Sequence, residues 1–264
     1  MDSPIQIQSS SMGTSRVCFN SSCRDPESMQ KEIDWAAEEI LDRIPDGADD
    51  YSKAKVIYDA LLDRIRYDDS LQNYDLYHAL VEGSCVCEGY AKAFRYLGEL
   101  AGLEMGYYTG IGSGRGNSDL HAWNSAILDG ELYYFDPTWD DREEDSFGDK
   151  LHLWFAVPYD DFIGSHTPDI RHPMTASDAS ENCYFYREGQ VLHGPNESEL
   201  MQMLLLDTMR LEIYCENPEG YDYLLSVVSD PALFSPEIYA SGKAVTSWHY
   251  IDVKERNAIL LQFE

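Results

Sequence analysis

The sequence predicts an α+β protein in which helices pack on an antiparallel sheet and a small C-terminal α/β appendix follows. Apolar residues recur at helical spacing in three segments before residue 103. Segments rich in aromatic and branched residues, divided by Gly, Asp-Gly and Pro, begin only after that point. Because helices come first and antiparallel strands follow, the main part of the chain is typical of an α+β domain.

The first expected elements are three helices. The first has Asp25 as its N-cap and Pro26 at its first position, with Gly47 beyond its end. The second covers residues 51–69, and the third follows two cysteines and stops at Gly102. Their apolar stripes are Ile33, Ala37, Ile40 and Ile44; Ala54, Ile57, Tyr58, Leu61, Leu62 and Ile65; and Val86, Tyr90, Ala93, Phe94, Leu97, Leu100 and Ala101.

Strands are expected next, and a separate unit after them. The strand-like segments are residues 103–112, 121–139 and 151–158. Near the C-terminus the patterns predict helices at 196–207 and 218–230 and strands at 209–216, 245–252 and 257–263. We therefore expect a polar, flexible leader over residues 1–24, a main domain over 25–182 and a small α/β domain over 183–264.

The charge balance limits the partners of this protein. The 264 residues include 19 basic and 48 acidic side chains, which gives a net charge of −29. Because nucleic-acid affinity depends on Lys and Arg, we expect no nucleic-acid partner and no binding to anionic membranes. No stretch approaches the roughly 18 to 20 consecutive apolar residues that cross a bilayer, so we expect no membrane insertion. An acidic surface favours Lys-rich partners.

The leader and the cysteines leave two questions open. The first residues lack the basic and apolar regions of a signal peptide. A secreted or cell-envelope protein whose signal has been removed is slightly favoured over a cytoplasmic one. Cys18 and Cys23 are placed either to form a local bridge or to remain two free thiols. The six cysteines, which permit up to three disulfides, are Cys18, Cys23, Cys85, Cys87, Cys183 and Cys215.

A hairpin is predicted around Asp129 and Gly130, since Asp-Gly is a strong signal for a two-residue turn. If these two residues form the loop, Leu128 pairs with Glu131. Each further cross-strand pair lies one residue earlier on the first strand and one residue later on the second. Trp123 then lies opposite Asp136, and His121 lies opposite Thr138. His121 and Asp136 become diagonal neighbours on one face, about 7 to 8 Å apart at Cα, so that imidazole and carboxylate can meet. A shift of one residue would place them on opposite faces.

Cys87 stands at the start of the third predicted helix. The positive end of a helix dipole and the free N–H groups of its first turn stabilise a thiolate. A histidine oriented by a carboxylate completes a nucleophile, base and orienter arrangement, and Cys87, His121 and Asp136 supply the three in chain order. The backbone N–H of Cys87 is the nearest donor for an oxyanion, and Tyr67 is a weak candidate for the second.

These motifs carry a family resemblance. The segments "GSCVCEGYAKAFRYLGELAG" and "HAWNSAILDGELYYFDPTWDD" resemble the core of bacterial proteins of the transglutaminase-like superfamily, over roughly residues 50 to 170. The resemblance implies a papain-like fold with a Cys/His/Asp triad, which makes residues 25–182 the catalytic domain. It implies Cys87 as nucleophile in preference to Cys85, because Cys87 directly precedes the x-Gly-Tyr, with His121 as base and Asp136 as orienter.

The resemblance implies thiol acyl chemistry on a polypeptide substrate, with no cofactor. A thioester on Cys87 gives hydrolysis of a peptide or isopeptide bond when water accepts the acyl group. The alternatives are amine transfer to a lysine, as in a cross-linking transglutaminase, and a non-catalytic binding module on the same fold. The natural substrate, the role of the C-terminal domain and the oligomeric state stay open.

Other residues receive weaker assignments. Trp123 and Trp139 flank the pair His121 and Asp136 and are expected to wall the site, either as core packing or as a substrate shelf. His166 could line the cleft but is given no role. A zinc site at Cys85, Cys87 and His121 is disfavoured by the Cys-x-Cys spacing, and the acidic run at 140–150 departs from a calcium loop because Ser146 stands where glycine is required. We therefore expect no metal.

Overall fold

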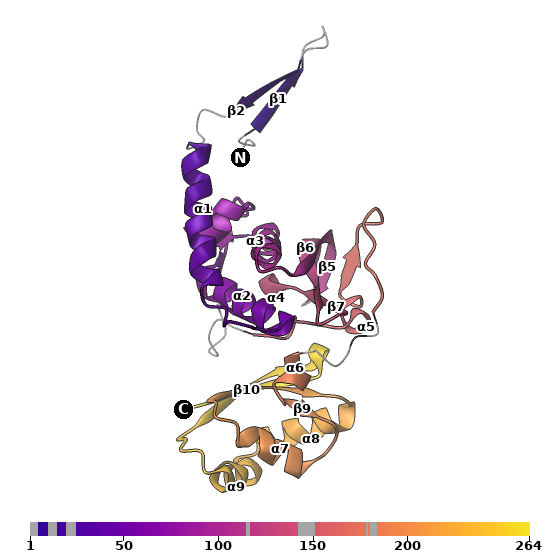
Figure 1. Ribbon diagram of the computed structural model, residues 1–264. Helices are drawn as coiled ribbons and strands as arrows, with labels where there is room; N and C mark the ends of the chain where they lie inside the picture. The colour runs from indigo at the N-terminus through magenta and orange to yellow at the C-terminus, as the bar shows by residue number, and fades with distance from the viewer. Residues whose placement is uncertain are drawn as a thin grey trace.

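The computed structural model describes residues 5–9, 15–19, 25–114, 117–141, 151–177, 179 and 184–264. Helices pack on a four-stranded antiparallel sheet of order β7-β6-β5-β8, and a second four-stranded sheet of order β11-β12-β10-β9 belongs to the C-terminal part (Figure 1). The predicted α+β fold class is confirmed. Among the described helices, none combines the length and hydropathy that a membrane-spanning segment needs.

The helical half of the main domain contains α1 (Pro26–Leu41), α2 (Asp50–Arg64) and α3 (Cys87–Leu100). Asp25 caps α1 and Pro26 is its first residue, as predicted. Buried apolar side chains of all three helices belong to one core cluster with the inner face of the sheet. Asn124 of the sheet, itself fully buried, donates hydrogen bonds to Ala91 O at 3.1 Å and Gly106 O at 3.0 Å, which ties α3 to two strands.

The second helix is shorter than predicted. α2 ends at Arg64, and β3 (Arg66–Tyr67) pairs in parallel with β4 (Ser84–Cys85), after the π-helical turn His78–Glu82. Arg66 N donates to Gly83 O at 2.9 Å, so the chain leaves the helix to bond with the segment that leads into α3. The expected helix over 51–69 is therefore wrong beyond residue 65, because tertiary pairing overrides the helical periodicity.

The sheet of the main domain is built from β5 (Glu104–Gly114), β6 (Asn117–Leu128), β7 (Glu131–Phe135) and β8 (His166–Pro168), with short helices α4 (Pro137–Asp140) and α5 (Tyr159–Phe162). The strand expected at 151–158 is wrong. That segment is buried and irregular, and only Val157 pairs, exchanging two 2.9 Å hydrogen bonds with Tyr134. Within the acidic run 140–150, residues 142–150 lie outside the described residues.

The C-terminal part follows the predicted order of helices and strands. It contains α6 (Tyr184–Arg187), β9 (Val191–Leu192), α7 (Glu197–Leu204), β10 (Arg210–Cys215), α8 (Pro218–Ser229), α9 (Pro231–Ser241), β11 (Trp248–Val253), a 3₁₀ turn (Lys254–Arg256) and β12 (Ala258–Phe263). Helix α9 was not predicted. Asp230 ends α8 and caps α9, with Pro231 as its first residue.

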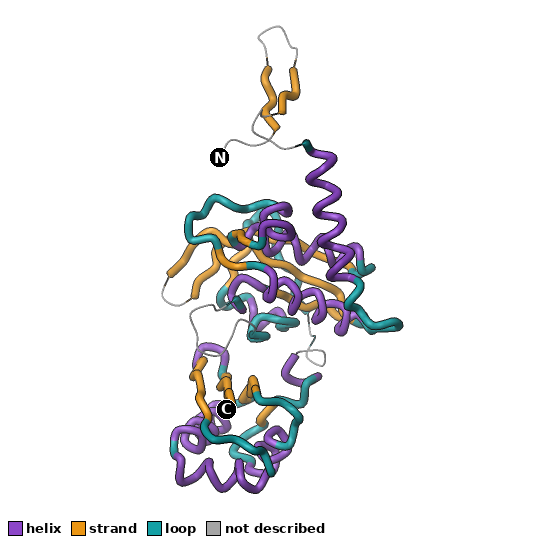
Figure 2. The backbone as a smooth tube through the Cα atoms, turned by 90° about the vertical axis from the view of Figure 1, so that its left-hand side faces the viewer, coloured by secondary structure: helices purple, strands orange, loops and turns teal. Residues whose placement is uncertain are grey.

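The C-terminal part has its own apolar cluster and also joins the main core. One cluster is formed by apolar side chains of α7, α8 and α9 with those of the strands. Figure 2 shows the helices of this part gathered next to its strands. In contrast, Val191, Val253, Ala258 and Leu260 belong to the cluster of the main domain. In the leader, β1 (Ile5–Ser9) pairs antiparallel with β2 (Ser15–Phe19). The domain boundaries at 24/25 and 182/183 stay predictions, as does the flexibility of the leader.

Candidate active site

Cys87 is the first residue of α3, with Val86 as an extended N-cap. Its side chain is half-buried, whereas Cys85 and Cys215 are fully buried free thiols. Gly89 explains how the helix can begin over Cys85, because a Cβ at this position would lie 2.5 Å from the Cys85 Sγ. Cys85 therefore acts as a small core residue beneath the first turn, and of the three cysteines whose side chains the structure describes, Cys87 is the one that a solute can reach. The pairing of Cys18, Cys23 and Cys183 lies outside the described side chains.

The predicted hairpin register is confirmed as far as Phe135. Asp129 and Gly130 form the turn with φ of 52° and 96°, and the ladder runs from Leu128↔Glu131 to Asn124↔Phe135. The expected pairs of Trp123 with Asp136 and of His121 with Thr138 do not form. Pro137 has no N–H to donate, and the chain turns into α4 there.

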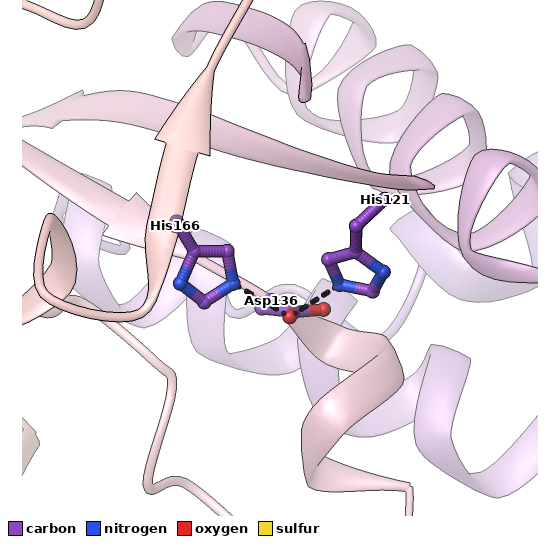
Figure 3. Close-up of side chains that lie close together, drawn as sticks. All are labelled: His121, Asp136 and His166. Carbon is purple, nitrogen blue, oxygen red and sulfur yellow. Dashed lines mark hydrogen bonds and ion pairs between the residues drawn. The ribbon is translucent and has the colours of Figure 1, made fainter. Parts of the chain in front are cut away.

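Asp136 is the N-cap of α4 and is completely buried. Its Oδ1 accepts hydrogen bonds from the backbone N–H groups of Thr138 at 3.1 Å and Trp139 at 3.3 Å. Its Oδ2 lies 2.7 Å from His121 Nε2 and 3.0 Å from His166 Nε2 (Figure 3). Four donors thus surround one buried carboxylate, which fixes both its orientation and its charge.

His121 lies between Asp136 and Cys87. Its Nε2 faces Asp136, and Cys87 is near enough to act on the protonation of the His121 imidazole. Burial opposes the protonation of His121, but the charge and hydrogen bond of Asp136, together with Cys87, outweigh it and raise the pKa of His121 to about 10. Burial acts against the ionisation of Asp136, yet His121 and His166 hold the pKa of this carboxyl well below its usual range. The resting site therefore contains an imidazolium paired with a carboxylate.

The aromatic candidates occupy different places. Trp123 is fully buried and lies behind His121, with ring centroids 6.3 Å apart, so it is core packing and offers no surface to a substrate. Trp139 is half-buried and stacks on His121 at 5.2 Å. Tyr67 is 38% exposed on β3, beside the strand that leads to Cys87, and burial together with the charge of Cys87 raises the pKa of Tyr67.

Gly112 leaves space for the stacked rings of His121 and Trp139. A Cβ at Gly112 would lie 3.0 Å from both the His121 ring and the Trp139 ring. We expect Gly112→Val to lower the free energy of unfolding by about 1 to 3 kcal/mol, because the two rings must move apart. Urea denaturation measures this loss. Gly164→Val is the matched control, since nothing lies within 4 Å of a Cβ there; an equal loss in both variants would contradict the steric explanation.

His166 is the site residue for which the sequence analysis predicted no role. It is fully buried in β8, and β8 reaches the site by pairing with Gly110–Gly112 of β5. No periodic pattern marks this short strand, and the signal available was a lone histidine in "GSHTPD". Within the described residues, His121, Asp136 and His166 form a group whose ligand atoms lie within 4.8 Å of one another, close enough to consider a metal.

Part of this sequence is similar to a known protein family. Residues 38–137 match the model of the transglutaminase-like superfamily. The chain contains a transglutaminase-like core domain. The matched part of this domain includes Cys87, His121 and Asp136, and it ends before His166.

Two relatives of the transglutaminase-like domain are peptidases by name. Kyphoscoliosis peptidase of Homo sapiens is 29% identical over 135 residues, which cover 42% of this chain and 20% of that protein. The Mus musculus protein of the same name is 27% identical over 135 residues with the same coverage. The chain thus spans about a fifth of the length of these relatives. A solved TGase structure is 15% identical with a TM-score of 0.38, and the alignment covers 48% of this chain and 36% of that one.

Proposed function

We propose that this protein is a thiol-dependent acyl-transfer enzyme that hydrolyses a peptide or isopeptide bond through a thioester on Cys87. One observation carries the proposal. The half-buried Cys87 at the N-terminus of α3 is near enough to His121 to act on its protonation, and His121 Nε2 is 2.7 Å from the buried Asp136. Nucleophile, base and orienter are therefore available in one place and in the order that the chemistry needs. The transglutaminase-like match and the peptidase relatives support the same chemistry.

In the first half-reaction, the Cys87 thiolate attacks the carbonyl carbon of the scissile amide. His121 Nε2 is engaged by Asp136, so Nδ1 is the nitrogen left to serve Cys87 and the substrate. The tetrahedral intermediate collapses as His121 gives its Nδ1 proton to the leaving amine, and a thioester and a neutral imidazole result. In the second half-reaction, His121 takes a proton from water, the hydroxide displaces the thiolate, and the imidazolium–thiolate pair is restored.

The oxyanion of each tetrahedral intermediate needs donors. The backbone N–H of Cys87 is one, because it belongs to the first turn of α3 and has no partner within the helix. Tyr67 is the candidate for the second. Since burial and the charge of Cys87 raise the pKa of Tyr67, its phenol stays protonated and can donate.

The substrate that fits this site is a polypeptide, with Lys-rich sequences favoured by the net charge of −29. The half-buried Trp139, stacked on His121, supplies an apolar wall next to the reacting atoms. Amine transfer is the second candidate, because the same thioester reacts with a lysine amine if the site admits it in place of water. A binding module that makes no thioester is the non-enzymatic alternative.

Alkylation by iodoacetamide between pH 5 and 9, mapped by mass spectrometry, tests the activated thiol. Burial raises the pKa of Cys215 to about 12 and also raises the pKa of Cys85, so these two thiols are internal controls. At pH 6 we expect Cys87 to react at least about tenfold faster than either of them, because a helix N-terminus and an imidazolium stabilise its thiolate. His121→Ala should abolish this selectivity.

Activity assays then distinguish hydrolysis, amine transfer and binding without catalysis. Lys-rich peptides are incubated with and without an added primary amine, and products are identified by mass. Cleavage without the amine supports hydrolysis, and incorporation of the amine supports transfer. If Cys87 shows neither selective alkylation nor an acyl-enzyme with any peptide, the enzyme proposal is wrong and the binding module replaces it.

A further inference from the structure

His166 is held in a cage of aromatic rings. Its ring centroid lies 3.8 Å from that of Phe162, 4.4 Å from Trp139, 5.0 Å from Trp123 and 5.2 Å from Trp154. A fully buried imidazole in such surroundings is costly unless both of its nitrogens are hydrogen-bonded. Both are: Nε2 lies 3.0 Å from Asp136 Oδ2, and Nδ1 lies 2.9 Å from Ser165 Oγ.

The proton on His166 belongs to Nε2. Asp136 Oδ2 can only accept, so the Nε2 facing it must donate. The Ser165 hydroxyl has one proton, which can go to Phe162 O at 3.1 Å or to His166 Nδ1; when it goes to Nδ1, the ring is neutral with a single N–H that points at the carboxylate. Burial lowers the pKa of His166, and the nearby charge of His121 acts in the same direction against the pull of Asp136.

We propose that His166 is a positioning residue of this site: its Nε2–H holds Asp136 at the oxygen shared with His121 and so makes His121 easier to deprotonate. The inference rests on the proposed function, in which His121 must lose and regain a proton in every turnover. His166 touches neither the thiol nor the peptide in this scheme, and it acts through Asp136.

The effect follows from the charge on Asp136. While His121 is protonated, the carboxylate has a cation beside it. When His121 gives up its Nδ1 proton, the buried anion loses that cation and depends on neutral donors: Thr138 N, Trp139 N, the Nε2–H that His121 keeps, and His166 Nε2. A donor stabilises the unpaired anion more than the paired one, so His166 favours the state with neutral His121. That state is the one that accepts a proton from water during deacylation.

The charged groups around this cluster come from three elements. Asp136, between β7 and α4, and His121, on β6, act on His166 directly. Cys87, at the start of α3, acts on His121 and raises the pKa of that imidazole. The remaining neighbours of His166 named above are uncharged rings and the Ser165 hydroxyl, so removal of the His166 N–H changes one hydrogen bond to Asp136.

Three variants distinguish the effect of the hydrogen bond from His166 to Asp136 from the effect of packing around the ring. His166→Phe keeps a ring in the cage but has no donor. In His166→Gln the side-chain amide nitrogen falls near the place of Nε2 and can donate to Asp136. In His166→Asn it falls near the place of Nδ1, where it can reach Ser165 but not Asp136. Gln and Asn therefore form a matched polar pair, which keeps the test available if the Phe variant does not fold.

The measurement is the NMR titration of ¹³C-labelled histidine in full-length protein carrying Cys87→Ser. Without the thiolate, the titration of His121 moves down into an accessible pH range, because Cys87 raises the pKa of His121. We expect His166→Phe and His166→Asn to raise the His121 midpoint by about one pH unit, since one donor to the carboxylate is lost. His166→Gln should stay within about 0.3 of a unit of its parent.

In protein with Cys87 intact, the Phe and Asn variants should lower kcat for peptide hydrolysis by about tenfold with little change in KM, and the Gln variant should restore it. An unchanged His121 midpoint in folded Phe and Asn variants would overturn the proposal. So would loss of activity on chelation that Zn²⁺ restores, because the two imidazoles would then be metal ligands. If the wild-type protein cleaves nothing, the proposed enzyme fails, whereas the NMR titration still decides the role of His166.

Discussion

Asp136→Asn should reduce peptide hydrolysis by about 10³ to 10⁴ while the protein stays folded, on the scale of the equivalent exchange in serine-protease triads. Oδ1 accepts from Thr138 N and Trp139 N, so the amide oxygen of an asparagine must occupy that position. The amide NH₂ then takes the place of Oδ2 and faces His121 Nε2, which is 2.7 Å from Oδ2 in the native protein.

This exchange inverts the direction of the hydrogen bond. The amide donates to His121 Nε2, so a neutral His121 carries its proton on Nδ1 and cannot accept one from the thiol or from water. The second N–H of the amide can donate to His166 Nε2, and His166 Nδ1–H can donate to Ser165, which in turn donates to Phe162 O at 3.1 Å. Each polar group that bonds to Asp136, His166 or Ser165 in the native protein thus keeps a partner, which is why folding should survive.

Steady-state hydrolysis and thermal unfolding measured on the same preparation test this expectation. Asp140→Asn is the matched control. Asp140 is also buried in α4, and burial raises its pKa to about 7 against the hydrogen bonds from Tyr58 and Trp154 N, so a neutral side chain suits the position. Its activity should stay within about threefold of wild type. If Asp136→Asn keeps more than a tenth of the activity, Asp136 is not the orienting group.

The contact between His121 and Asp136 could be predicted because it depends on local chemistry. The Asp129-Gly130 turn sets the register, and the register sets which side chains share a face. Likewise, Gly102, with positive φ, follows directly on the C-cap of α3, which it was expected to stop, whereas α1 already ends at Leu41, well before Gly47. Each of these inferences uses residues within about twenty positions of each other, where turn type and periodicity carry the information.

The rest of the site depends on contacts between distant segments. His166 joins through β8, three residues long, whose pairing with β5 bridges more than fifty positions. From sequence alone, a glycine such as Gly112 is expected to weaken a strand. The reason for a glycine at this position is the close approach of the Trp139 ring, which the structure shows. The buried segment 151–158 has the composition of a strand, but the turn that it makes is set by Asp140, which accepts a hydrogen bond from Trp154 N.

His152→Phe should destabilise the protein by about 3 to 5 kcal/mol, the largest effect on folding that we expect. His152 Nε2 lies 2.7 Å from Asp59 Oδ1 in α2, and Nδ1 lies 3.0 Å from Glu212 Oε1 in β10. Glu212 is 3% exposed. A phenyl ring could keep the stacking on Tyr184, at 4.2 Å between centroids, but it would remove the nearer of the two cations of the buried Glu212 carboxylate and leave only Arg210, at 3.5 Å.

The pH dependence of the free energy of unfolding tests whether His152 is charged between Asp59 and Glu212. Burial disfavours the imidazolium, but Glu212 and Asp59 outweigh it and raise the pKa of His152 to about 9. A pKa raised above the unfolded value of about 6.5 means that the stabilisation is complete below pH 6.5 and is lost as pH rises to 9. The full difference corresponds to about 3 kcal/mol. A cavity of about 410 Å³ beside Asp59, His152 and Glu212 admits water, so the measured value should be smaller.

Urea denaturation at pH 6 and at pH 9 isolates this contribution from the rest of the titration. The wild-type free energy of unfolding should fall between the two pH values by more than that of His152→Phe, because the variant has no imidazolium to lose. Adding Glu212→Gln to His152→Phe should recover part of the loss at pH 6, since a buried anion that has lost one of its two cations is removed. His249→Phe is the control, because the ion pair of His249 with Glu264 is exposed and its loss should leave stability unchanged. Equal pH dependence in wild type and His152→Phe would mean that His152 is neutral in the folded protein, and that hydrogen bonds without charge hold α2 to β10.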